Sequence, residues 1–467
     1  MLIIFGILFL ARLDAGAGEV GFTSKPSVQK KDGLATVSFA VNRSTDVAVY
    51  VLNAKDKCVR HVAAGVLGGK NPPPAPLKPG LAQKLEWDGK DDYGEAATGG
   101  PFKVRVALGL DPEFGGFLLH HRAALPRVSR LAVGPKGELY CFYLDPASLE
   151  QNNGGFKIRV RSREGKPISV KTPGWSGLMN FQQNYMDVSV KDEIYVVPGS
   201  NGKMKWTAGG AGNLTVFGMD LLPKRVAVSG VSIGCIPRLD LAGNIYLAEN
   251  VRPLEGNYPK FFAGKLKSGK SAGFPKQERA ADWPYTYMYG SIVKFPPEGG
   301  KILAKAPKDA KDKGLLPFRY PMRFQRNRRG ALKGAEWVRF GFSPYSNISI
   351  GGGSQNCMCE GSGFGVDGFG RVFYPNLGRF RVEMIDTNNN FIGTFGKYGN
   401  MDSGGPDAIV KTPDIPLAWP TYVAVGDSYA FVSDVASTRI VKVKLNYAVE
   451  AVCPAAGGPA SITRAGL

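Results

Sequence analysis

Histidine is scarce in this sequence, and its scarcity restricts the metal and cofactor chemistry that the chain can support. Only three of 467 residues are histidines: His61 and the adjacent His120 and His121. A catalytic zinc ion typically binds two or three imidazoles, or imidazole together with a carboxylate, so the chain after His121 is not expected to hold one. The motif C-x-x-C-H is absent, which excludes covalently attached haem. We interpret His120 and His121 as linker residues rather than ligands.

Long apolar runs are missing near the N-terminus as well. The run from Leu2 to Ala11 is shorter than the roughly 20 residues that cross a bilayer. It precedes Ala15-Gly16-Ala17, a small-x-small cleavage pattern, so residues 1–17 are predicted to be a signal peptide. A buried first strand is the alternative. No cysteine lies near the cleavage point to take a lipid. We therefore expect a protein that is secreted, periplasmic or at the cell surface.

Acidic residues are few relative to basic ones. The chain has 59 Lys and Arg against 39 Asp and Glu, which gives a net charge of +20 and a pI of about 9.6. Because an exported chain does not meet genomic nucleic acid, we expect no nucleic-acid partner. The charge instead favours an anionic polysaccharide, a peptidoglycan-associated polymer or acidic lipid head groups. An extracellular protein partner is a further alternative. A role in solubility alone is the alternative.

Glycine and proline, in contrast, are abundant. The 61 glycines and 33 prolines make up about a fifth of the chain, against a usual share of roughly an eighth. This composition favours many short strands joined by turns, and therefore an all-β protein.

We predict a signal peptide at 1–17, a β-sandwich at 18–112, a linker at 113–126, a β-propeller at 127–454 with a basic insertion at about 306–335, and a tail at 455–467.

The first domain shows the alternation of half-buried strands. Val47, Val49 and Val51 alternate with smaller or more exposed residues, and a second alternation runs from Phe102 to Val106. Between them lies WDGKDDYG (Trp87 to Gly94), which is dense in turn-forming residues. The pattern VLNAKDKCVR followed by WDGKDDYG and a closing strand resembles the Ig-like domain of the flagellar hook-capping protein. That resemblance implies a scaffold or spacer without catalytic residues.

One unit of strand, turn and aromatic-ended strand recurs along the rest of the chain. Its copies are LAVGPKGELYCF (131–142), DVSVKDEIYVV (187–197), LDLAGNIYLAEN (239–250), GVDGFGRVFYPN (365–376) and VAVGDSYAFVSD (423–434). The spacing favours propeller blades of four strands. Because one gap is more than twice the others, we predict six blades, with a degenerate one between Gly290 and Asn347. Its outer strands would be 290–305 and 336–343, and five blades plus an insertion is the alternative.

The last copy continues as FVSDVASTRIVKVKL (Phe431 to Leu445), which resembles an NHL repeat. The whole chain resembles secreted planctomycete-type bacterial proteins in which an Ig-like module precedes an NHL propeller with Cys-x-Cys-Glu before its penultimate blade. The resemblance implies a fold and an extracellular setting in a bacterium, and no activity. NHL-type lyases that hold zinc with imidazoles have no counterpart here, because the propeller contains no histidine.

Oxygen ligands at the predicted channel mouth suggest an alternative function. Gluconolactonase-like hydrolases, another six-bladed family, hold a divalent cation with Glu, Asn and Asp, which suit Ca²⁺. The corresponding candidates here are Glu249, Asn250, Asp367, Asn376 and Asp434. We favour a different role for Asp367 and Asp434, which is to accept hydrogen bonds from turn amides. No cofactor is predicted unless the metal hypothesis holds.

Six cysteines in an exported chain suggest disulfides. Cys58 is alone in the first domain, and Cys357 and Cys359 are poorly placed to bridge each other because only one residue separates them. We expect one of that pair to bridge to Cys235 or Cys453, or Cys141 to join Cys453 where the ring closes. A thiolate metal site at Cys357 and Cys359 is the alternative. The disulfide candidates are Cys141, Cys235, Cys357, Cys359 and Cys453.

Arginines alternate with aromatic residues in FRYPMRFQRNRRGALKGAEW (Phe318 to Trp337). Guanidinium groups bind sulfate, phosphate and carboxylate in a bidentate manner. The candidate ligand-binding residues are Arg319, Tyr320, Arg323, Phe324, Arg326, Arg328 and Arg329. A solvated insertion is the alternative. We predict a non-catalytic exported binding or scaffold protein whose propeller presents the ligand surface, and the alternative is a metal-assisted hydrolase or lyase.

Overall fold

The structure is a computed structural model of the chain. It describes residues 19–118, 128–134, 137–144, 156–171, 186–197, 212–218, 220, 222–231, 235–249, 251, 253–254, 290–319, 329–342, 345–348, 358–361, 363–399, 412–434, 437, 439–456 and 461–463. These residues form β-strands, turns and one short 3-10 helix (Leu377–Arg379), which confirms the all-β prediction. No helix in these ranges is long and apolar enough to cross a membrane.

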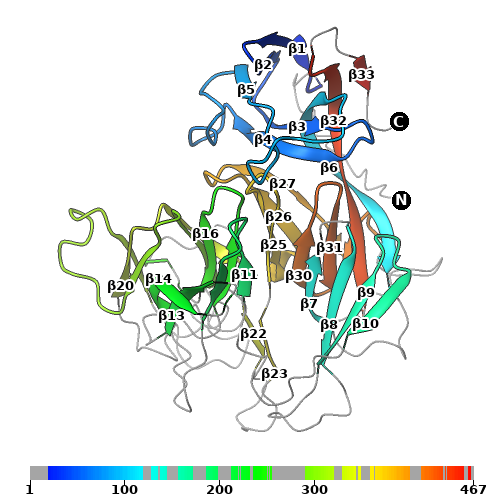
Figure 1. Cartoon of the computed structure of the whole chain (residues 1–467). Coiled ribbons are helices and arrows are strands. Elements are labelled where there is room, and N and C mark those ends of the chain that lie inside the picture. The colour runs from blue at the N-terminus through cyan, green and yellow to red at the C-terminus, as the bar shows by residue number, and fades with distance from the viewer. Residues whose placement is uncertain are drawn as a thin grey trace, which may run out of the picture.

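The N-terminal part is a sandwich of two antiparallel sheets (Figure 1). One sheet has the order β1-β2-β5, formed by β1 (Phe22–Lys31), β2 (Leu34–Val41) and β5 (Ala82–Trp87). The other contains β4 (Cys58–Leu67), β3 (Thr45–Leu52), β6 (Lys103–Leu118) and the end of β32 (Arg439–Pro454). Val49 of β3 packs in the core with Phe39 and Trp87, as the alternation predicted. However, every residue of β3 is buried, because its second face is also covered.

Five four-stranded antiparallel units follow in a propeller-like arrangement, and the second and fifth of these units are parts of larger seven-stranded sheets. The first contains β7 (Val128–Val133), β8 (Leu139–Leu144), β9 (Phe156–Arg161) and β10 (Pro167–Lys171). The second contains β11 (Met186–Val188), β12 (Ile194–Val196), β13 (Gly212–Phe217) and β14 (Pro223–Val231). The third contains β15 (Ile236–Leu239), β16 (Ile245–Glu249), β17 (Gly290–Phe295) and β21 (Trp337–Phe342). The fourth contains β24 (Gly365–Val366), β25 (Val372–Asn376), β26 (Arg381–Ile385) and β27 (Phe391–Phe395). The fifth contains β30 (Pro420–Val425), β31 (Tyr429–Asp434), β32 and β6.

Each predicted copy of the repeat forms the first hairpin of one sheet. In the fourth sheet, the Asp367 carboxylate accepts hydrogen bonds from the backbone amides of Phe369 and Arg371 and so closes the turn between β24 and β25. Apolar cores join the second sheet to the third, the third to the fourth, the fourth to the fifth, and the fifth to the first. The segment from Gly365 to Asn376 is thus one repeat unit, as predicted.

The predicted sixth blade does not form within the described residues. The strands expected for it, β17 and β21, instead pair with β16 and complete the third sheet. The chain between them forms a hairpin extension that we call the basic arm, defined as residues 300–319 and 329–335. It contains β18 (Gly300–Leu303), β19 (Leu316–Arg319) and β20 (Arg329–Lys333), and β18 pairs with β14 of the second sheet. The described residues therefore fit the alternative prediction, which was five blades plus an insertion.

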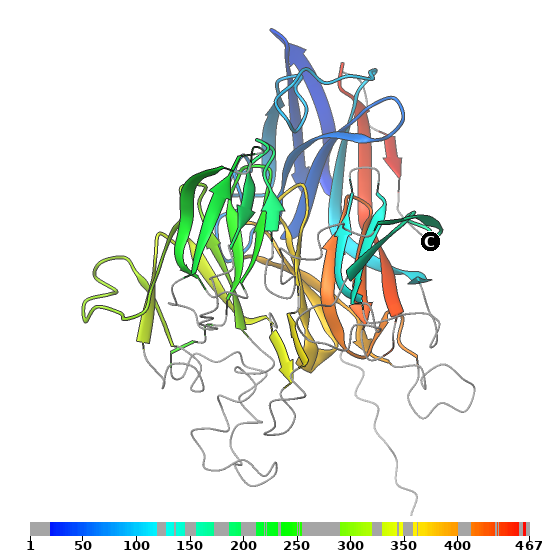
Figure 2. The same ribbon diagram turned by 60° about the horizontal axis from the view of Figure 1, so that its bottom comes forward.

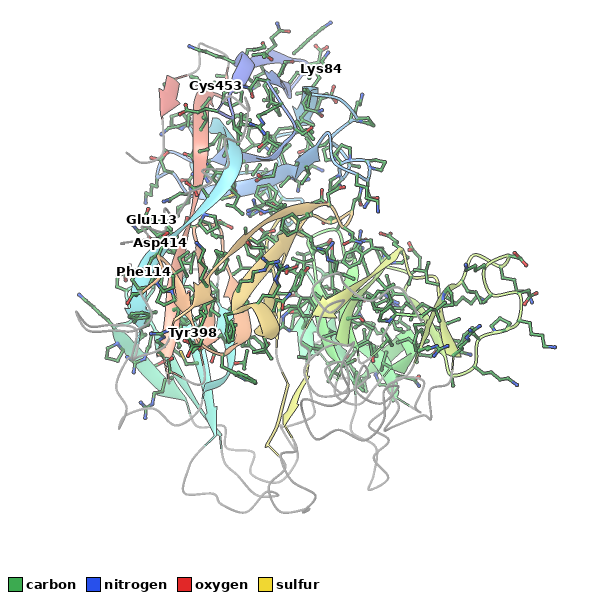
Figure 3. The ribbon with its side chains drawn as sticks, turned by 180° about the vertical axis from the view of Figure 1, so that it is seen from behind. Lys84, Glu113, Phe114, Tyr398, Asp414 and Cys453 are labelled. Carbon is green, nitrogen blue, oxygen red and sulfur yellow. The ribbon has the colours of Figure 1, made fainter. Side chains whose placement is uncertain are left out.

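Two long strands run through both parts of the molecule. β6 and β32 pair antiparallel from Leu118 and Ile440 in the fifth sheet to Lys103 and Pro454 in the sandwich. Figure 3 shows this span, with Cys453 at the sandwich and Glu113 and Phe114 beside the fifth sheet. Residues 113–118 of the predicted linker are therefore strand, and the end of β32 belongs to the sandwich rather than to the propeller. The sandwich is fixed to the propeller-like unit by shared strands.

Small pairings complete the described structure. β22 (Tyr345–Ile348) pairs with β23 (Met358–Gly361), and β28 (Lys397–Tyr398) pairs with β29 (Pro416–Leu417). β33 (Ser461–Thr463) adds to β32 at the sandwich end, so part of the predicted tail is also strand.

Candidate functional site

The junction between the sandwich and the propeller-like unit contains a buried polar network. Arg371, which is 1% exposed, donates from Nε to Asp367 Oδ2 at 2.7 Å and from Nη1 to the Tyr447 hydroxyl at 2.9 Å. The Tyr447 hydroxyl is 2.6 Å from that of Tyr50 in β3. Burial raises the pKa of Tyr50 well above its ordinary value, so this hydroxyl stays protonated. The network ties the second face of β3 to the fourth sheet and to β32.

Two β-bulges bring Cys58 and His61 to this junction. Residues three apart on a regular strand point to opposite faces. In β4, however, the pairing with β3 skips Val59, so that Cys58 lies opposite Leu52 and His61 opposite Tyr50. Leu52 and Tyr50 are two apart and share a face, so the bulge places Cys58 and His61 on the same side of the sheet. That side faces the propeller-like unit.

The imidazole of His61 lies between two carboxylates. Asp92, from the WDGKDDYG turn, is 2.6 Å from Nδ1 through Oδ2, and its Oδ1 accepts a hydrogen bond from the His61 backbone amide. Asp427, from the turn between β30 and β31, is 3.0 Å from Nε2. Burial alone lowers the pKa of His61, but the hydrogen bonds to Asp427 and Asp92 outweigh it and raise the pKa well above its ordinary value. The protonated ring thus joins the sandwich to the fifth sheet.

Close packing fixes the orientation of this ring. Phe369 meets it edge to face with centroids 4.6 Å apart. A Cβ atom at Gly368 would lie 2.5 Å from Cε1 of His61, so only glycine permits this approach. Cys58 Sγ lies 3.8 Å from Nδ1 and 3.7 Å from Nε2. Burial raises the pKa of the Cys58 thiol, and both ring nitrogens already bind carboxylates, so this pair is not a thiolate nucleophile with a free base.

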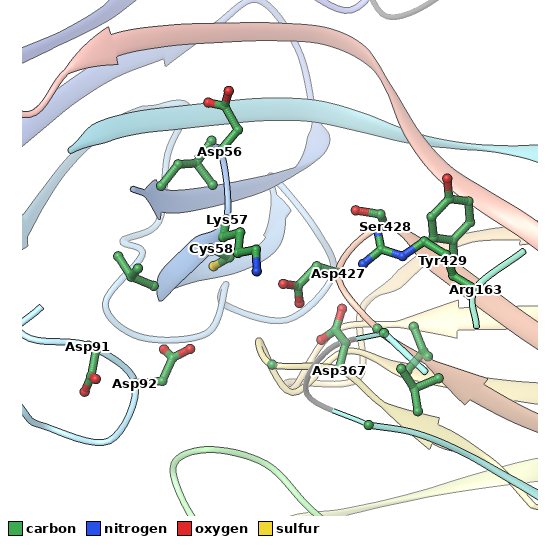
Figure 4. Close-up of a pocket in the computed structure, with 18 of the residues that line it drawn as sticks. Asp56, Lys57, Cys58, Asp91, Asp92, Arg163, Asp367, Asp427, Ser428 and Tyr429 are labelled. Atoms are coloured by element: carbon green, nitrogen blue, oxygen red, sulfur yellow. The ribbon is translucent and has the colours of Figure 1, made fainter. Parts of the chain in front are cut away.

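A cavity of about 610 Å³ lies beside this cluster (Figure 4). Cys58, Asp92 and Asp427 contribute to its wall, together with residues of the first and fourth sheets. Its other charged lining residues are Asp56, Lys57, Asp91, Arg105, Arg163 and Asp367. The cavity is therefore polar, and it is bounded by both structural units.

The residues predicted to bind calcium have other partners. Asp434 accepts hydrogen bonds from the amides of Ala418 and Trp419 and from Arg439 Nε, and Asp367 is bound to its own turn and to Arg371. The amide-accepting role that we favoured for these two aspartates is confirmed.

The remaining calcium candidates are also engaged or lie outside the structure. Asn376 donates to Glu383, and the buried Glu249 hydrogen-bonds with the Cys235 thiol. Among the described residues, Glu249, Asp367 and Asp434 do not form a cluster of three or more possible ligands. Asn250 lies outside the described residues, so its predicted role stays a prediction.

The predicted disulfide between Cys141 and Cys453 is not formed, and Cys235 is also free. Each of these thiols is buried in a different apolar core, which explains why they cannot meet. Burial raises the pKa of Cys141 to about 12 and that of Cys453 to about 11, so both thiols stay protonated. Because Cys235 and Cys453 are free, the bridges predicted to them from Cys357 or Cys359 are not formed either. Cys357 lies outside the described residues, so the thiolate metal site that was the alternative for this pair stays a prediction.

The basic arm carries two of the seven predicted ligand-binding residues. Arg329 is exposed, but Arg319 is buried, so its side chain does not form part of an exposed patch. The other candidates, Tyr320, Arg323, Phe324, Arg326 and Arg328, lie outside the described residues. The described arm nevertheless has eight basic residues and two acidic ones, Asp309 and Asp312. Its exposed cations are Lys301, Lys305, Lys308, Lys311, Lys313, Arg329 and Lys333.

Like charges lie directly opposite each other across the arm. Lys301 of β18 pairs with Lys333 of β20, and Arg319 of β19 pairs with Arg329 of β20. Like charges directly opposite each other destabilise a sheet. Of these four residues, Arg319 is buried, and Lys301, Arg329 and Lys333 are exposed. The arm projects from the side of the molecule in two views (Figures 1 and 2). It therefore presents concentrated positive charge to solvent.

The junction cluster was missed by sequence reasoning. Cys58-x-x-His61 and Asp92, the third aspartate of WDGKDDY, were visible signals, but two strand residues three apart give no reason to expect a shared face. Asp427 is 366 positions from His61, and no local pattern connects them.

Comparison with known proteins adds no family assignment. No protein-family model and no curated protein sequence match the chain. Similar solved structures include an auxiliary nutrient binding protein from Bacteroides thetaiotaomicron (9% identity, 90% of this chain and 97% of that chain, TM-score 0.30). Another is regucalcin from Agrobacterium tumefaciens (10% identity, 72% of this chain and 94% of that chain, TM-score 0.27). A third is virginiamycin B lyase from Staphylococcus aureus (11% identity, 91% of this chain and 99% of that chain, TM-score 0.24). At these identities and TM-scores, no activity or ligand is transferred to this chain.

Proposed function

We propose that the protein is an exported, non-catalytic binding protein whose basic arm binds an anionic polysaccharide. The observation that carries the proposal is the cross-strand pairing of two exposed lysines, Lys301 of β18 opposite Lys333 of β20. Such pairs reduce sheet stability. An anionic ligand would relieve the repulsion, which gives these positions a role in binding.

The charge distribution supports this proposal. The described arm has a net charge of +6, from eight basic and two acidic residues, and the Lys313–Asp309 ion pair is its one internal ion pair among the described residues. Exposed charges act over about 8 Å at physiological ionic strength. Neighbouring cations on one hairpin therefore reinforce each other toward a polymer that carries repeated negative charge. On sequence grounds, we extend the proposed contacts to Arg323, Arg326 and Arg328, with Tyr320 and Phe324 as aromatic surfaces for sugar rings.

The rest of the chain supports a scaffold for this arm. Shared strands join the sandwich to the propeller-like unit, which suits a support, and the resemblance to the Ig-like module of the hook-capping protein and to NHL propellers favours the same role. We propose that the protein is secreted, periplasmic or at the surface of a planctomycete-type bacterium. Binding is favoured over catalysis because both nitrogens of His61 are committed to carboxylates and the Cys58 thiol stays protonated.

Retention on immobilised polyanions tests the proposal. The variant Lys301→Ser/Lys308→Ser/Lys311→Ser/Lys333→Ser removes four exposed cations from the arm. Its matched control removes four exposed cations from the sandwich, Lys25, Lys30, Lys31 and Lys84, the last of which Figure 3 shows far from the arm. Both variants have the same net charge.

We expect the arm variant to lose affinity for heparin and polygalacturonate by roughly tenfold or more at low salt, because each cation near an anionic surface contributes up to about 1 kcal/mol. The control should lose much less, and neutral dextran should retain neither protein. Equal losses in both variants would mean that only net charge matters, and the arm proposal would be wrong.

A further inference from the structure

The junction cluster brings three kinds of metal ligand together. Among the described residues, Cys58 Sγ, a ring nitrogen of His61 and a carboxylate oxygen of Asp427 lie within 4.8 Å of one another. Thiolate, imidazole and carboxylate donors together suit Zn²⁺ better than the hard cations Ca²⁺ and Mg²⁺. The carboxylates of Asp92 and Asp427 also favour a cation at this position. The cluster thus has the donor set of a transition-metal site.

Two of the three separations between the donors are close to those of tetrahedral coordination, and the third, between Cys58 Sγ and the Asp427 carboxylate, is within 4.8 Å. From ordinary zinc bond lengths, a nitrogen and an oxygen on one ion lie about 3.3 Å apart, and a nitrogen and a sulfur about 3.6 Å apart. Here Nε2 of His61 is 3.0 Å from Asp427 Oδ1 and 3.7 Å from Cys58 Sγ. An ion would replace the proton that Nε2 shares with Asp427, and the proton of the Cys58 thiol would be released when the sulfur binds the ion as a thiolate.

Asp92 supplies the support that metal-binding histidines usually have. Such a histidine places its second ring nitrogen against a carboxylate, which fixes the tautomer and orients the ring. Asp92 Oδ2 is 2.6 Å from Nδ1, and Oδ1 is held by the backbone amide of the same histidine. Gly368 and Phe369 pack on the ring. Nε2 is thereby directed toward Asp427.

Cys58 is the ligand that must move. Its sulfur is almost equidistant from the two ring nitrogens, 3.8 Å and 3.7 Å, so it lies over the ring face. An ion on Nε2 lies in the ring plane, about 2 Å beyond the nitrogen. Rotation about the Cα–Cβ bond of Cys58 carries the sulfur toward that point, and the adjoining cavity, which Cys58 and Asp427 both line, gives the space.

The geometry points to a Zn²⁺-type site formed by Cys58, His61 and Asp427, with Asp92 as the positioning residue and the fourth coordination position open to the cavity. This ion would link β4 of the sandwich to the turn between β30 and β31. The site is distinct from the basic arm and goes beyond the polysaccharide-binding function proposed above.

Cobalt substitution tests this inference directly. The full chain, stripped with a chelator, is titrated with Co²⁺, and the absorption spectrum reports tetrahedral d–d bands and a thiolate-to-cobalt charge-transfer band. The variants are Cys58→Ser and Asp427→Asn, and the matched control is Asp56→Asn, which changes a carboxylate that lines the same cavity outside the cluster. Far-UV circular dichroism of each metal-free variant confirms that it is folded.

We expect the parent and Asp56→Asn to bind one equivalent with both sets of bands. Cys58→Ser should lose the charge-transfer band, and both cluster variants should bind at least about tenfold more weakly. Asp92→Asn should keep the spectrum but lose about 10- to 100-fold in affinity, as a supporting residue does. The inference is overturned if the parent shows no charge-transfer band, if the band persists in Cys58→Ser, or if Asp427→Asn binds like the parent. The arm variant should bind Co²⁺ normally, which separates this result from the polysaccharide proposal.

Discussion

Replacing Arg371 by methionine should strongly destabilise the whole protein. The side chain is 1% exposed and donates to Asp367 and Tyr447. Methionine fills similar space but leaves the Asp367 carboxylate buried without its cation and removes the hydrogen bond that Arg371 donates to the Tyr447 hydroxyl. Removing one partner of a buried ion pair costs about 3–5 kcal/mol. We expect a loss of that size in the free energy of unfolding.

Urea denaturation followed by tryptophan fluorescence measures this loss, and Lys103→Met is the matched control. Lys103 lies on β6 and pairs with Asp56 at 2.8 Å, but the two side chains are 38% and 67% exposed. An exposed pair contributes only about 0–1 kcal/mol.

Because β6 and β32 belong to both units, we also expect the parent to unfold in one transition. The reasoning is refuted if Arg371→Met costs no more than Lys103→Met, or if the two units of the parent unfold separately.

Three further predictions follow from single contacts. Burial raises the pKa of Glu383, but hydrogen bonds from Arg381 and other donors outweigh it and lower the pKa. The stabilising effect of this carboxylate is therefore present above its unfolded pKa of about 4.5 and is lost as pH falls through the folded value. The difference in stability between the parent and Glu383→Gln should shrink between pH 7 and about pH 3, and an unchanged difference would contradict this. Gly368→Ala should cost about 1–3 kcal/mol because the new Cβ overlaps the His61 ring, whereas Gly21→Ala, where a Cβ has room, should be close to neutral in the same urea titration. Thiol titration of the unfolded, unreduced chain should find at least four free thiols, and two or fewer would show that the buried cysteines are bridged.

Local patterns predicted the repeat hairpins well. Alternating apolar residues and an intervening turn specify a hairpin with little help from the rest of the chain. All five copies accordingly form one, and Asp367 closes its turn as expected. The assignment of strands beyond the first hairpin was less successful. β17 begins 41 residues after β16 ends, and no local pattern states that they pair.

The shared strands and the junction site lay beyond sequence reasoning for a similar reason. Alternation in β32 continues from the last repeat into the sandwich without a break, so nothing marks the change of unit. Alternation in β3 indicated one buried face, but Tyr50 is buried on the other because Tyr447 and Phe369 cover it. The meeting of His61 with Asp427 depends on a bulge and on this docking, and both are tertiary effects.

Hydrogen exchange of the protein with and without a polygalacturonate oligosaccharide tests the central claim most directly, because it reports where the ligand lies. The account predicts slower amide exchange in β18, β19 and β20 of the basic arm at saturating ligand, reversed by high salt, with exchange in β1 and β2 of the sandwich unchanged. Protection confined to other segments, or no change in the arm under conditions where binding is measured, would contradict it.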